Sequence, residues 1–312
     1  MVSRDKRVTI LDLQKMQQQG TKIPMLTAYD YPSARLAERA GCPILLVGDT
    51  LGMVVLGYDS TLPVTLEDMI HHGRAARRGA SNAHIVVDLP FGSYQSDVST
   101  AMNAAMRVMK ETECDSVKIE GGNSQAIETV AKLVTAGVPV MAHIGLTPQS
   151  VNALGGFKLQ GRTPRDAIRL LSEAQKLQEA GAFAIVLESI PAVLAAKITE
   201  VLSIPTIGIG AGPYCAGQVQ VWHDLLGLYD SFKPRHARRF DDIGASIRGA
   251  LVDYIEAVEA GDFPNSSESF GLSEEVESLK QDFQKKLDEV RMEALHLRNT
   301  GHEEGLAERE SM

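Results

Sequence analysis

The sequence is poor in cysteine and in aromatic residues, and it lacks any long hydrophobic run. Its three cysteines, Cys42, Cys114 and Cys215, lie too far apart for a disulfide framework or a C-x-x-C metal site. We therefore expect three small buried side chains in a reducing compartment. No apolar run approaches the roughly 20 residues that span a bilayer, and residues 1–11 lack the apolar segment of a signal peptide. These absences predict a cytoplasmic protein.

The chain also lacks an excess of positive charge. Its formal net charge is −9 at pH 7, from 31 basic and 40 acidic residues. A negative surface disfavours broad non-specific binding to nucleic acid or to an anionic membrane. With 44% hydrophobic and 23% charged residues, the composition is that of an ordinary globular protein. The sequence therefore predicts neither a nucleic-acid partner nor a membrane partner.

The acidic charge is concentrated near the C-terminus, where residues 265–312 hold 12 acidic and 6 basic residues. Turn-forming residues at 261–267 mark a boundary between a domain of residues 1–264 and an extension of residues 265–312. Apolar side chains then recur every three or four positions, which predicts an amphipathic helix docked on this chain or on another subunit. We expect its end, from Asn299, to be frayed or disordered. The apolar stripe consists of Leu272, Val276, Leu279, Phe283, Leu287, Val290, Ala294 and Leu297.

Short apolar runs alternate with amphipathic stretches through residues 1–264. Several of these stretches end in glycine just before the next run, as a helix does before a buried strand in a βαβ unit. Eight strands fit a (β/α)8 barrel. A doubly wound open sheet is the alternative, but it would carry a glycine-rich turn after its first strand, and residues 28–32 contain no glycine. The expected strands are residues 23–27, 43–47, 84–87, 116–119, 139–142, 183–187, 205–209 and 219–221.

Ionisable residues stand at the carboxyl ends of five consecutive strands. Asp49, Asp88 and Glu120 end or follow three neighbouring strands, and His143 and Glu188 do so for the next two. The carboxyl ends of parallel strands meet at one mouth of a barrel, where active sites form. We therefore expect these side chains to face one another.

The three carboxylates at neighbouring strand ends indicate a metal site. Unpaired, Asp49, Asp88 and Glu120 would repel one another and raise one another's pKa values. A divalent cation resolves that repulsion, and Mg2+ prefers oxygen ligands while keeping positions open for substrate. The alternative for Asp49 or Asp88 is that the side chain caps the following helix or turn.

Three further side chains complete the predicted site. Lys118 precedes Glu120 by two residues and shares its face of the strand, where it either binds a substrate carboxylate or forms a structural salt bridge. His143 is either a supporting residue at the rim or a hydrogen-bonded structural histidine. Glu188 stands apart from the predicted metal ligands in sequence and is available as a general base.

Nine strings of the sequence, in this order, resemble the ketopantoate hydroxymethyltransferase family. The resemblance runs from about residue 9 to residue 264. Two positions depart from the family pattern: Thr50 stands where the family usually has Ser, and Ala216 stands where Asp would be expected. The strings are residues 25–30, 47–53, 58–65, 88–94, 117–121, 143–150, 187–189, 208–212 and 232–235.

The resemblance implies a (β/α)8 barrel of the phosphoenolpyruvate mutase/isocitrate lyase type, followed in this chain by a C-terminal helical extension. It also implies Mg2+ bound by Asp49 and Asp88, with Glu120 as an additional ligand of the metal site. The family forms ring-like homo-oligomers, so a homo-oligomer, and by resemblance a decamer, is expected here.

The implied reaction moves a hydroxymethyl group from the co-substrate 5,10-methylenetetrahydrofolate to 3-methyl-2-oxobutanoate in pantothenate biosynthesis. Its products are 2-dehydropantoate and tetrahydrofolate. By resemblance, Asp49, Thr50, Asp88 and Lys118 contact the 2-oxo acid, and Glu188 accepts its C3 proton.

Two other functions stay open at this point. The nearer one is a carbon–carbon lyase or mutase that acts on a 2-oxo acid on the same barrel, although the Lys-Lys-Cys-Gly-His loop of isocitrate lyases is absent. The other is a non-catalytic barrel scaffold. A scaffold would be expected to lose some of the set Asp49, Asp88, Glu120 and Glu188, and all four are present.

Overall fold

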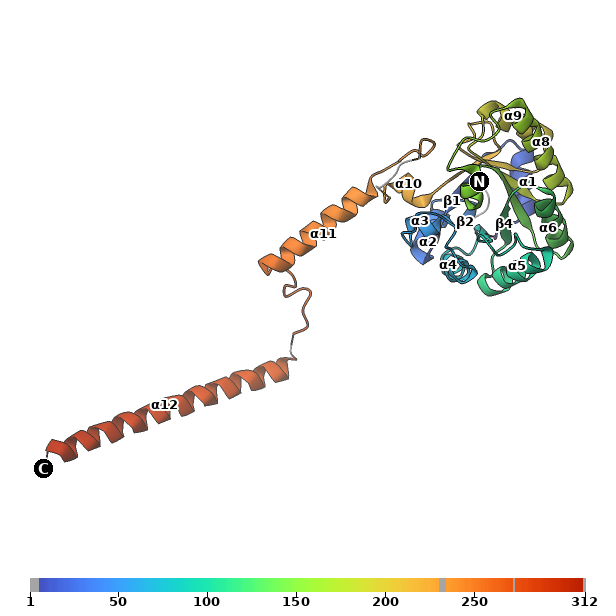
Figure 1. The fold of residues 1–312 in the computed structure, drawn as a ribbon. Coiled ribbons are helices and arrows are strands. Elements are labelled where there is room, and N and C mark those ends of the chain that lie inside the picture. The colour runs from blue at the N-terminus through green and yellow to red at the C-terminus, as the bar shows by residue number, and fades with distance from the viewer. Residues whose placement is uncertain (1–5, 230–233, 272, 311–312) are drawn as a thin grey trace. The chain divides into compact units, whose positions relative to one another are not determined.

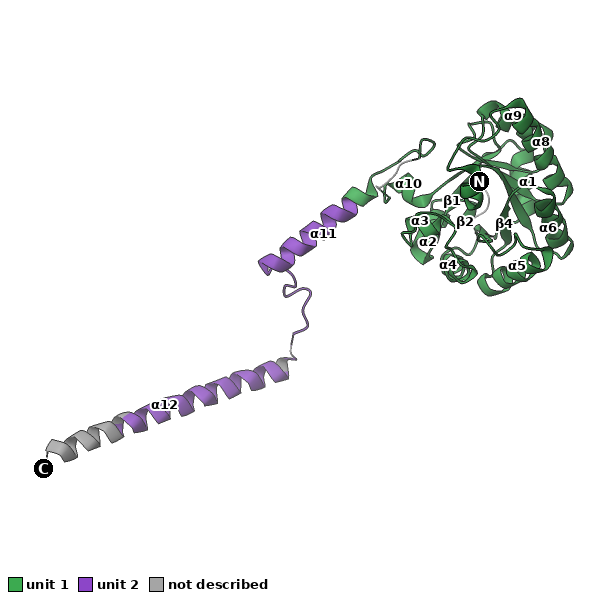
Figure 2. Cartoon of the chain, in the orientation of Figure 1, with its two compact units in different colours: residues 1–245 green, residues 246–312 purple. Residues whose placement is uncertain are grey.

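The computed structural model describes residues 6–229, 234–271 and 273–310 of the chain. Phe232 and Lys233, which open the last string of the family resemblance, lie outside them. Two compact units divide the chain, residues 1–245 and 246–312 (Figure 2). The boundary that the sequence predicts, between residues 264 and 265, falls within the second unit and stays a prediction.

Eight parallel strands close into a barrel in the first unit (Figure 1). Each strand pairs with the next along the chain, and β8 returns to pair with β1. Every strand expected from the sequence overlaps one of these, so the predicted (β/α)8 barrel is confirmed. The strands are β1 (Ile23–Thr27), β2 (Ile44–Val47), β3 (His84–Asp88), β4 (Ser116–Glu120), β5 (Val140–Gly145), β6 (Ala184–Glu188), β7 (Thr206–Ile209) and β8 (Gly217–Gln220).

Helices follow the first six strands and cover the outside of the barrel (Figure 1). Most begin at a Thr, Asp or Asn whose side chain accepts a hydrogen bond from a backbone amide of the first turn, which stabilises that helix end. The main ones are α2 (Tyr31–Arg39), α4 (Leu66–Gly79), α5 (Val98–Thr112), α6 (Ser124–Thr135), α8 (Pro164–Glu179) and α9 (Ala192–Val201). Shorter helices are α3 (Leu51–Val54), α7 (Val151–Leu154) and α10 (Trp222–Leu226), with a 3-10 turn at Pro148–Ser150.

The two-residue period of the strands separates an inner core from an outer core. Inward side chains such as Val86 and Met141 fill the barrel, and outward ones pack against the helices. Helix α1 (Ile10–Gln18) closes the amino end of the barrel with Leu13, which joins the inner cluster. Two residues further along β3 and β5, the inward positions become Asp88 and His143. The inner face is therefore apolar at the amino end and ionisable at the carboxyl end.

The three cysteines are buried and free, as the sequence predicts. In the part of the chain that the structure describes, no helix combines the length and the hydrophobicity needed to cross a membrane.

The second unit consists of helices joined by an irregular segment. Helix α11 (Ile243–Ala260) begins just before the unit boundary and has no buried residue. Helix α12 (Glu274–Glu310) contains the apolar stripe expected of the extension from Val276 onward, and Leu272, the first residue of that stripe, lies outside the described residues. Its backbone is helical to Glu310, so the segment from Asn299, where fraying was expected, continues the same helix.

Truncation after Pro264 should leave the barrel folded and its activity measurable, because every predicted catalytic residue lies before that point. The expected loss is a lower melting temperature or a smaller assembly, since a helix with an exposed apolar face needs a partner surface. Activity per subunit and mass by light scattering, measured on the same samples, test this. Abolished activity in a folded truncation of unchanged mass would mean that the extension contributes to an active site.

Candidate active site

Four of the predicted residues form one buried cluster at the carboxyl ends of β2, β3 and β4. The Nζ atom of Lys118 lies 2.7 Å from Oδ1 of Asp88 and 3.9 Å from Oε1 of Glu120. The backbone amide of Asp49 donates a hydrogen bond to Oδ2 of Asp88 at 3.1 Å. None of the four is more than 7% exposed. The strand register brings them together, because Asp88 and Lys118 are direct partners across β3 and β4.

His143 connects this cluster to Glu188. The Nδ1 atom of His143 lies 3.4 Å from Oε1 of Glu120, its register partner on β4, and its Nε2 atom lies 3.3 Å from Oε2 of Glu188. Glu188 ends β6 and is the most accessible of the predicted ionisable residues, with a side chain 15% exposed. The imidazole therefore bridges two carboxylates.

A glycine permits this arrangement at the end of β5. Gly145 has φ +99°, and a Cβ atom there would lie 2.2 Å from the carbonyl oxygen of Glu188. Any other residue would push the ends of β5 and β6 apart. Ser189, directly after Glu188, also has a left-handed φ of 47°, a conformation that is uncommon for a non-glycine residue and recurs at functional sites.

Burial shapes the ionisation of the two aspartates. Removal from water, and then the negative charges of Asp88 and Glu120, raise the pKa of Asp49 well above its ordinary value. Burial also raises the pKa of Asp88, against the opposing effect of Lys118. The mutual repulsion expected from the sequence is therefore present at these two positions.

The pKa of Glu120 shifts in the opposite direction from those of the two aspartates. Burial acts to raise its pKa, but the hydrogen bond and charge of His143, together with the charge of Lys118, outweigh burial and lower the pKa on balance. For His143, burial and the charge of Lys118 act to lower the pKa, yet its contacts with Glu120 and Glu188 raise it to about 9. The repulsion expected of unpaired carboxylates therefore does not decide the pKa of Glu120, because His143 and Lys118 lie close to it.

Gln149, in the 3-10 turn after β5, is a site residue that the sequence analysis missed. Its Nε2 atom donates to Oδ2 of Asp49 at 2.8 Å and to the carbonyl oxygen of Leu89 at 2.9 Å. Its backbone amide donates to Oε2 of Glu120 at 3.0 Å. One buried residue thus holds two carboxylates. The signal was present, since Gln149 lies in a string of the family resemblance, but an uncharged side chain in a loop attracted no role.

Tyr94 was missed for the same reason and fixes the orientation of Gln149. Its hydroxyl donates to Oε1 of Gln149 at 2.7 Å and accepts a hydrogen bond from the backbone amide of Glu120 at 3.0 Å. Gln95 also donates to that Oε1, at 2.8 Å. With two donors on its oxygen, the amide of Gln149 must direct its nitrogen at Asp49.

The capping alternative does not hold for either aspartate. The N-cap residue of α3 is Thr50, which is half-buried beside Asp49, and that of α5 is Asp97. Within the described ranges, no group of three or more His, Cys, Asp or Glu side chains is arranged to hold a metal ion as it stands. Asp88 faces Lys118 instead, and Glu120 faces Gln149 and His143.

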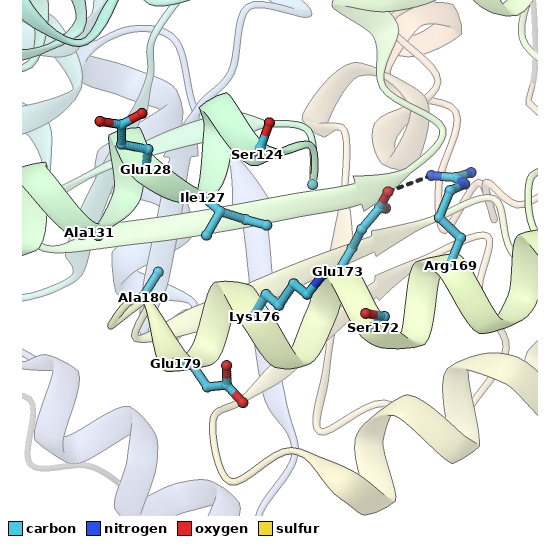
Figure 3. A pocket seen from close by; sticks show the side chains of 11 residues that line it. Ser124, Ile127, Glu128, Ala131, Arg169, Ser172, Glu173, Lys176, Glu179 and Ala180 are labelled. Carbon is cyan, nitrogen blue, oxygen red and sulfur yellow. Dashed lines mark hydrogen bonds and ion pairs between the residues drawn. The ribbon is translucent and has the colours of Figure 1, made fainter.

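A separate pocket of about 640 Å³ lies on the outside of the barrel, between α6 and α8 (Figure 3). Its charged residues include Arg169 and Glu173, which form an ion pair at 2.8 Å on the surface of α8. None of the predicted site residues lines it. This pocket is therefore separate from the predicted site at the mouth of the barrel.

Comparison with known proteins identifies close relatives over most of the chain. The family model described as ketopantoate hydroxymethyltransferase matches residues 7–266. A 3-methyl-2-oxobutanoate hydroxymethyltransferase of Carboxydothermus hydrogenoformans is 54% identical over 270 residues, which cover 86% of this chain and 98% of that protein. One of Chloroflexus aurantiacus is 57% identical over 263 residues, covering 84% of this chain and 92% of the relative.

Solved structures with much lower identity share the fold. A phosphoenolpyruvate phosphomutase from Streptomyces platensis aligns with a TM-score of 0.56 at 13% identity, covering 91% of this chain and 99% of that structure. A 2,3-dimethylmalate lyase of the phosphoenolpyruvate mutase/isocitrate lyase superfamily aligns with a TM-score of 0.53 at 14% identity, covering 92% and 98%. The predicted barrel type is therefore confirmed.

Replacing Gln149 with leucine should destabilise the protein by about 3 kcal/mol, because Asp49, Tyr94 and the Leu89 carbonyl would lose a hydrogen-bonding partner in the interior. Gln281→Leu, at an exposed position on α12, is the matched control and should change the free energy of unfolding by less than about 0.5 kcal/mol. Denaturant unfolding of both variants measures the difference. Equal stabilities would show that the hydrogen bonds of Gln149 contribute nothing.

Proposed function

This chain belongs to the ketopantoate hydroxymethyltransferase family, and we propose that it transfers a hydroxymethyl group from 5,10-methylenetetrahydrofolate to 3-methyl-2-oxobutanoate with Mg2+ as cofactor. Hydroxymethyl transfer in pantothenate biosynthesis is the activity of the family. The observation that carries the finer proposal is the buried cluster of Asp49, Asp88, Lys118 and Glu120 beside Glu188. The lyase and mutase alternative has support from the shared fold alone, because its representatives are only 13–14% identical.

The chemistry of the donor set, rather than the present arrangement of its side chains, suits a divalent cation. Asp49, Asp88 and Glu120 supply carboxylate oxygens within one buried region, whereas Lys118 and His143 are its only cations among the predicted site residues. Hard cations such as Mg2+ prefer oxygen ligands and reduce the repulsion between such groups. We propose Asp49 and Asp88 as ligands, with Glu120 as an additional one. When bound, the ion would polarise the keto and carboxylate oxygens of the substrate as a Lewis acid.

Lys118 is proposed to bind the 2-oxo acid together with the aspartates and Thr50. Its ammonium group is buried and held at Asp88, so it offers a fixed positive charge at the bottom of the site. The contacts with Asp88 and Glu120 raise its pKa against the effect of burial, which keeps it charged. A fixed ammonium group can orient a carboxylate without reorganisation during the reaction.

Glu188 is proposed to remove the C3 proton. It is more accessible than the buried carboxylates, and His143 is the only cation that contacts it among the described residues, so one oxygen remains available for the substrate. His143 acts as a positioning residue, since its Nε2 atom lies against Glu188 while Nδ1 lies against Glu120. A carboxylate within hydrogen-bond reach of a carbon acid that is activated by its keto group suits general-base catalysis.

The proposed reaction consumes one molecule of water. The electron pair left at C3 attacks the methylene carbon of the folate, forming the new carbon–carbon bond as a carbon–nitrogen bond of the folate breaks. Water hydrolyses the remaining carbon–nitrogen bond, which releases 2-dehydropantoate and tetrahydrofolate. The proton taken by Glu188 is available to the departing nitrogen.

We also propose a ring-like homo-oligomer, as the family resemblance implies. Helix α11 supports an assembly because it exposes apolar side chains along its length, among them Ile247, Leu251 and Ile255. Exposed apolar surfaces of this kind are typical of subunit interfaces.

Asp88→Ala should weaken Mg2+-dependent activity. It should also lower the melting temperature of a barrel that still folds, because buried Lys118 loses its nearest carboxylate. Losing even a supporting residue of a metal site lowers metal affinity or activity by about 10–100-fold, so loss of a ligand should have at least that effect. Activity across a Mg2+ titration, with a thermal melt of each protein, measures it. Asp282→Ala, at an exposed position on α12, is the control. A titration curve like that of the unchanged protein would contradict the metal assignment.

Glu188→Gln keeps the size of the side chain but cannot accept a proton. We expect substrate and Mg2+ still to bind, while exchange of the C3 proton with deuterium from the solvent slows by about 100-fold or more. Proton NMR of the substrate follows the exchange, and Glu128→Gln on the outside of α6 is the matched control. Exchange at the unchanged rate would assign proton removal to another residue.

A further inference from the structure

Helix α12 carries a row of exposed apolar side chains, which we call its seam. The side chains of Val276, Phe283, Leu287, Val290 and Leu297 are all between 45% and 73% exposed. They extend over about 32 Å of helix, at 1.5 Å per residue. The family model ends at residue 266, so this helix lies outside the segment that defines the family.

The spacing of the seam is that of a coiled coil. A first series of four apolar residues, at positions 276, 283, 290 and 297, has a spacing of seven. A second series begins four residues later in each repeat and includes Leu287 and Ala294. A repeat of seven with two apolar positions is the pattern with which two helices pack side chains into one another. Lys280, four residues after Val276, also belongs to this second series. A single charged residue at such a position restricts the register of a coiled coil and the number of helices in it. The four residues of the first series are Val276, Phe283, Val290 and Leu297.

We propose that α12 pairs antiparallel with α12 of a second copy of this chain. In the best register, Leu287 of one copy packs against Val290 of the other, and the small Ala294 packs against the large Phe283. Each contact occurs twice because the pair is symmetric. Large Phe283 and small Ala294 then share a layer on each side of the central Leu287 and Val290 contacts. Lys280 lies opposite Leu297 at each end, where its ammonium group can reach water.

The charges beside the seam select this register. Antiparallel pairing brings Glu277 of one copy opposite Arg298 of the other, and Lys286 opposite Glu293, again twice each. Sliding one helix by seven residues in one direction sets Lys286 of one copy opposite Lys286 of the other. Sliding it the other way sets Glu293 opposite Glu293 of the other copy, and Arg291 opposite Arg291 of the other copy. Like charges at an interface disfavour both alternatives.

A parallel pair is disfavoured by the same residues. It would align Phe283 with Phe283 and Ala294 with Ala294, leaving one layer crowded and another empty. It would also set Lys280 against Lys280, and Lys286 beside Arg291. The present contacts of Glu277 with Lys280 at 3.6 Å and of Arg291 with Asp288 at 3.9 Å are exposed and weak, so they do not compete with pairing.

Charge exchange on the full-length chain tests the proposal, which does not depend on the proposed reaction. Lys286→Glu should weaken the α12-dependent association by about tenfold or more, since it replaces two attractive contacts with two repulsive ones. Lys285→Glu makes the same change of charge at the neighbouring position, which faces away from the seam, and should have little effect. Combining Lys286→Glu with Glu293→Lys should restore association. Sedimentation over a dilution series measures it, and circular dichroism and activity check the fold.

Equal masses for Lys286→Glu and Lys285→Glu would overturn the pairing, as would failure of the combined exchange to restore it. Orientation is tested separately with spin labels on cysteines introduced at Ser278 or at Asp288, because the native cysteines are buried. In the antiparallel pair, labels at Ser278 lie about 30 Å apart and labels at Asp288 lie close together. Short distances at both positions would mean a parallel pair and would overturn the proposal.

Discussion

The ion pair between Lys118 and Asp88 is the contact on which the site depends. A lysine ammonium in the interior of a barrel is stable only when carboxylates surround it, and removing one partner of a buried pair is strongly destabilising. Asp88 meets this requirement from the neighbouring strand, with Glu120 further away. The pair fixes the side chains at the ends of β3 and β4, and the amide of Asp49 is held on the other oxygen of Asp88.

The remaining acidic groups are held by uncharged residues and by one imidazole. Gln149 donates to both Asp49 and Glu120, and His143 lies between Glu120 and Glu188. A network whose members are linked by ion pairs and hydrogen bonds keeps its geometry without substrate, which is the preorganisation that electrostatic catalysis requires. This arrangement accounts for a site with several like charges in a barrel that remains compact.

The chain combines a barrel that matches the family model with a helix beyond the matched segment. The family match and the relatives at 54% and 57% identity cover the barrel and the residues directly after it. The α12 helix lies beyond the matched segment, and its seam has the pattern of a helix pair rather than of a catalytic element. The proposed reaction and the proposed pairing of α12 thus belong to different parts of the sequence.

The sequence by itself determined the barrel, its eight strands and the ionisable residues at their carboxyl ends, because a two-residue period and glycine at helix ends are local signals. It could also place Lys118 and Glu120 on one face of one strand. Only the tertiary structure decided that Gln149 supports Asp49, and that His143 lowers the pKa of Glu120. These contacts depend on the register between strands and on the path of a loop. Neither is encoded in the pattern of any single segment, because both arise when the barrel closes.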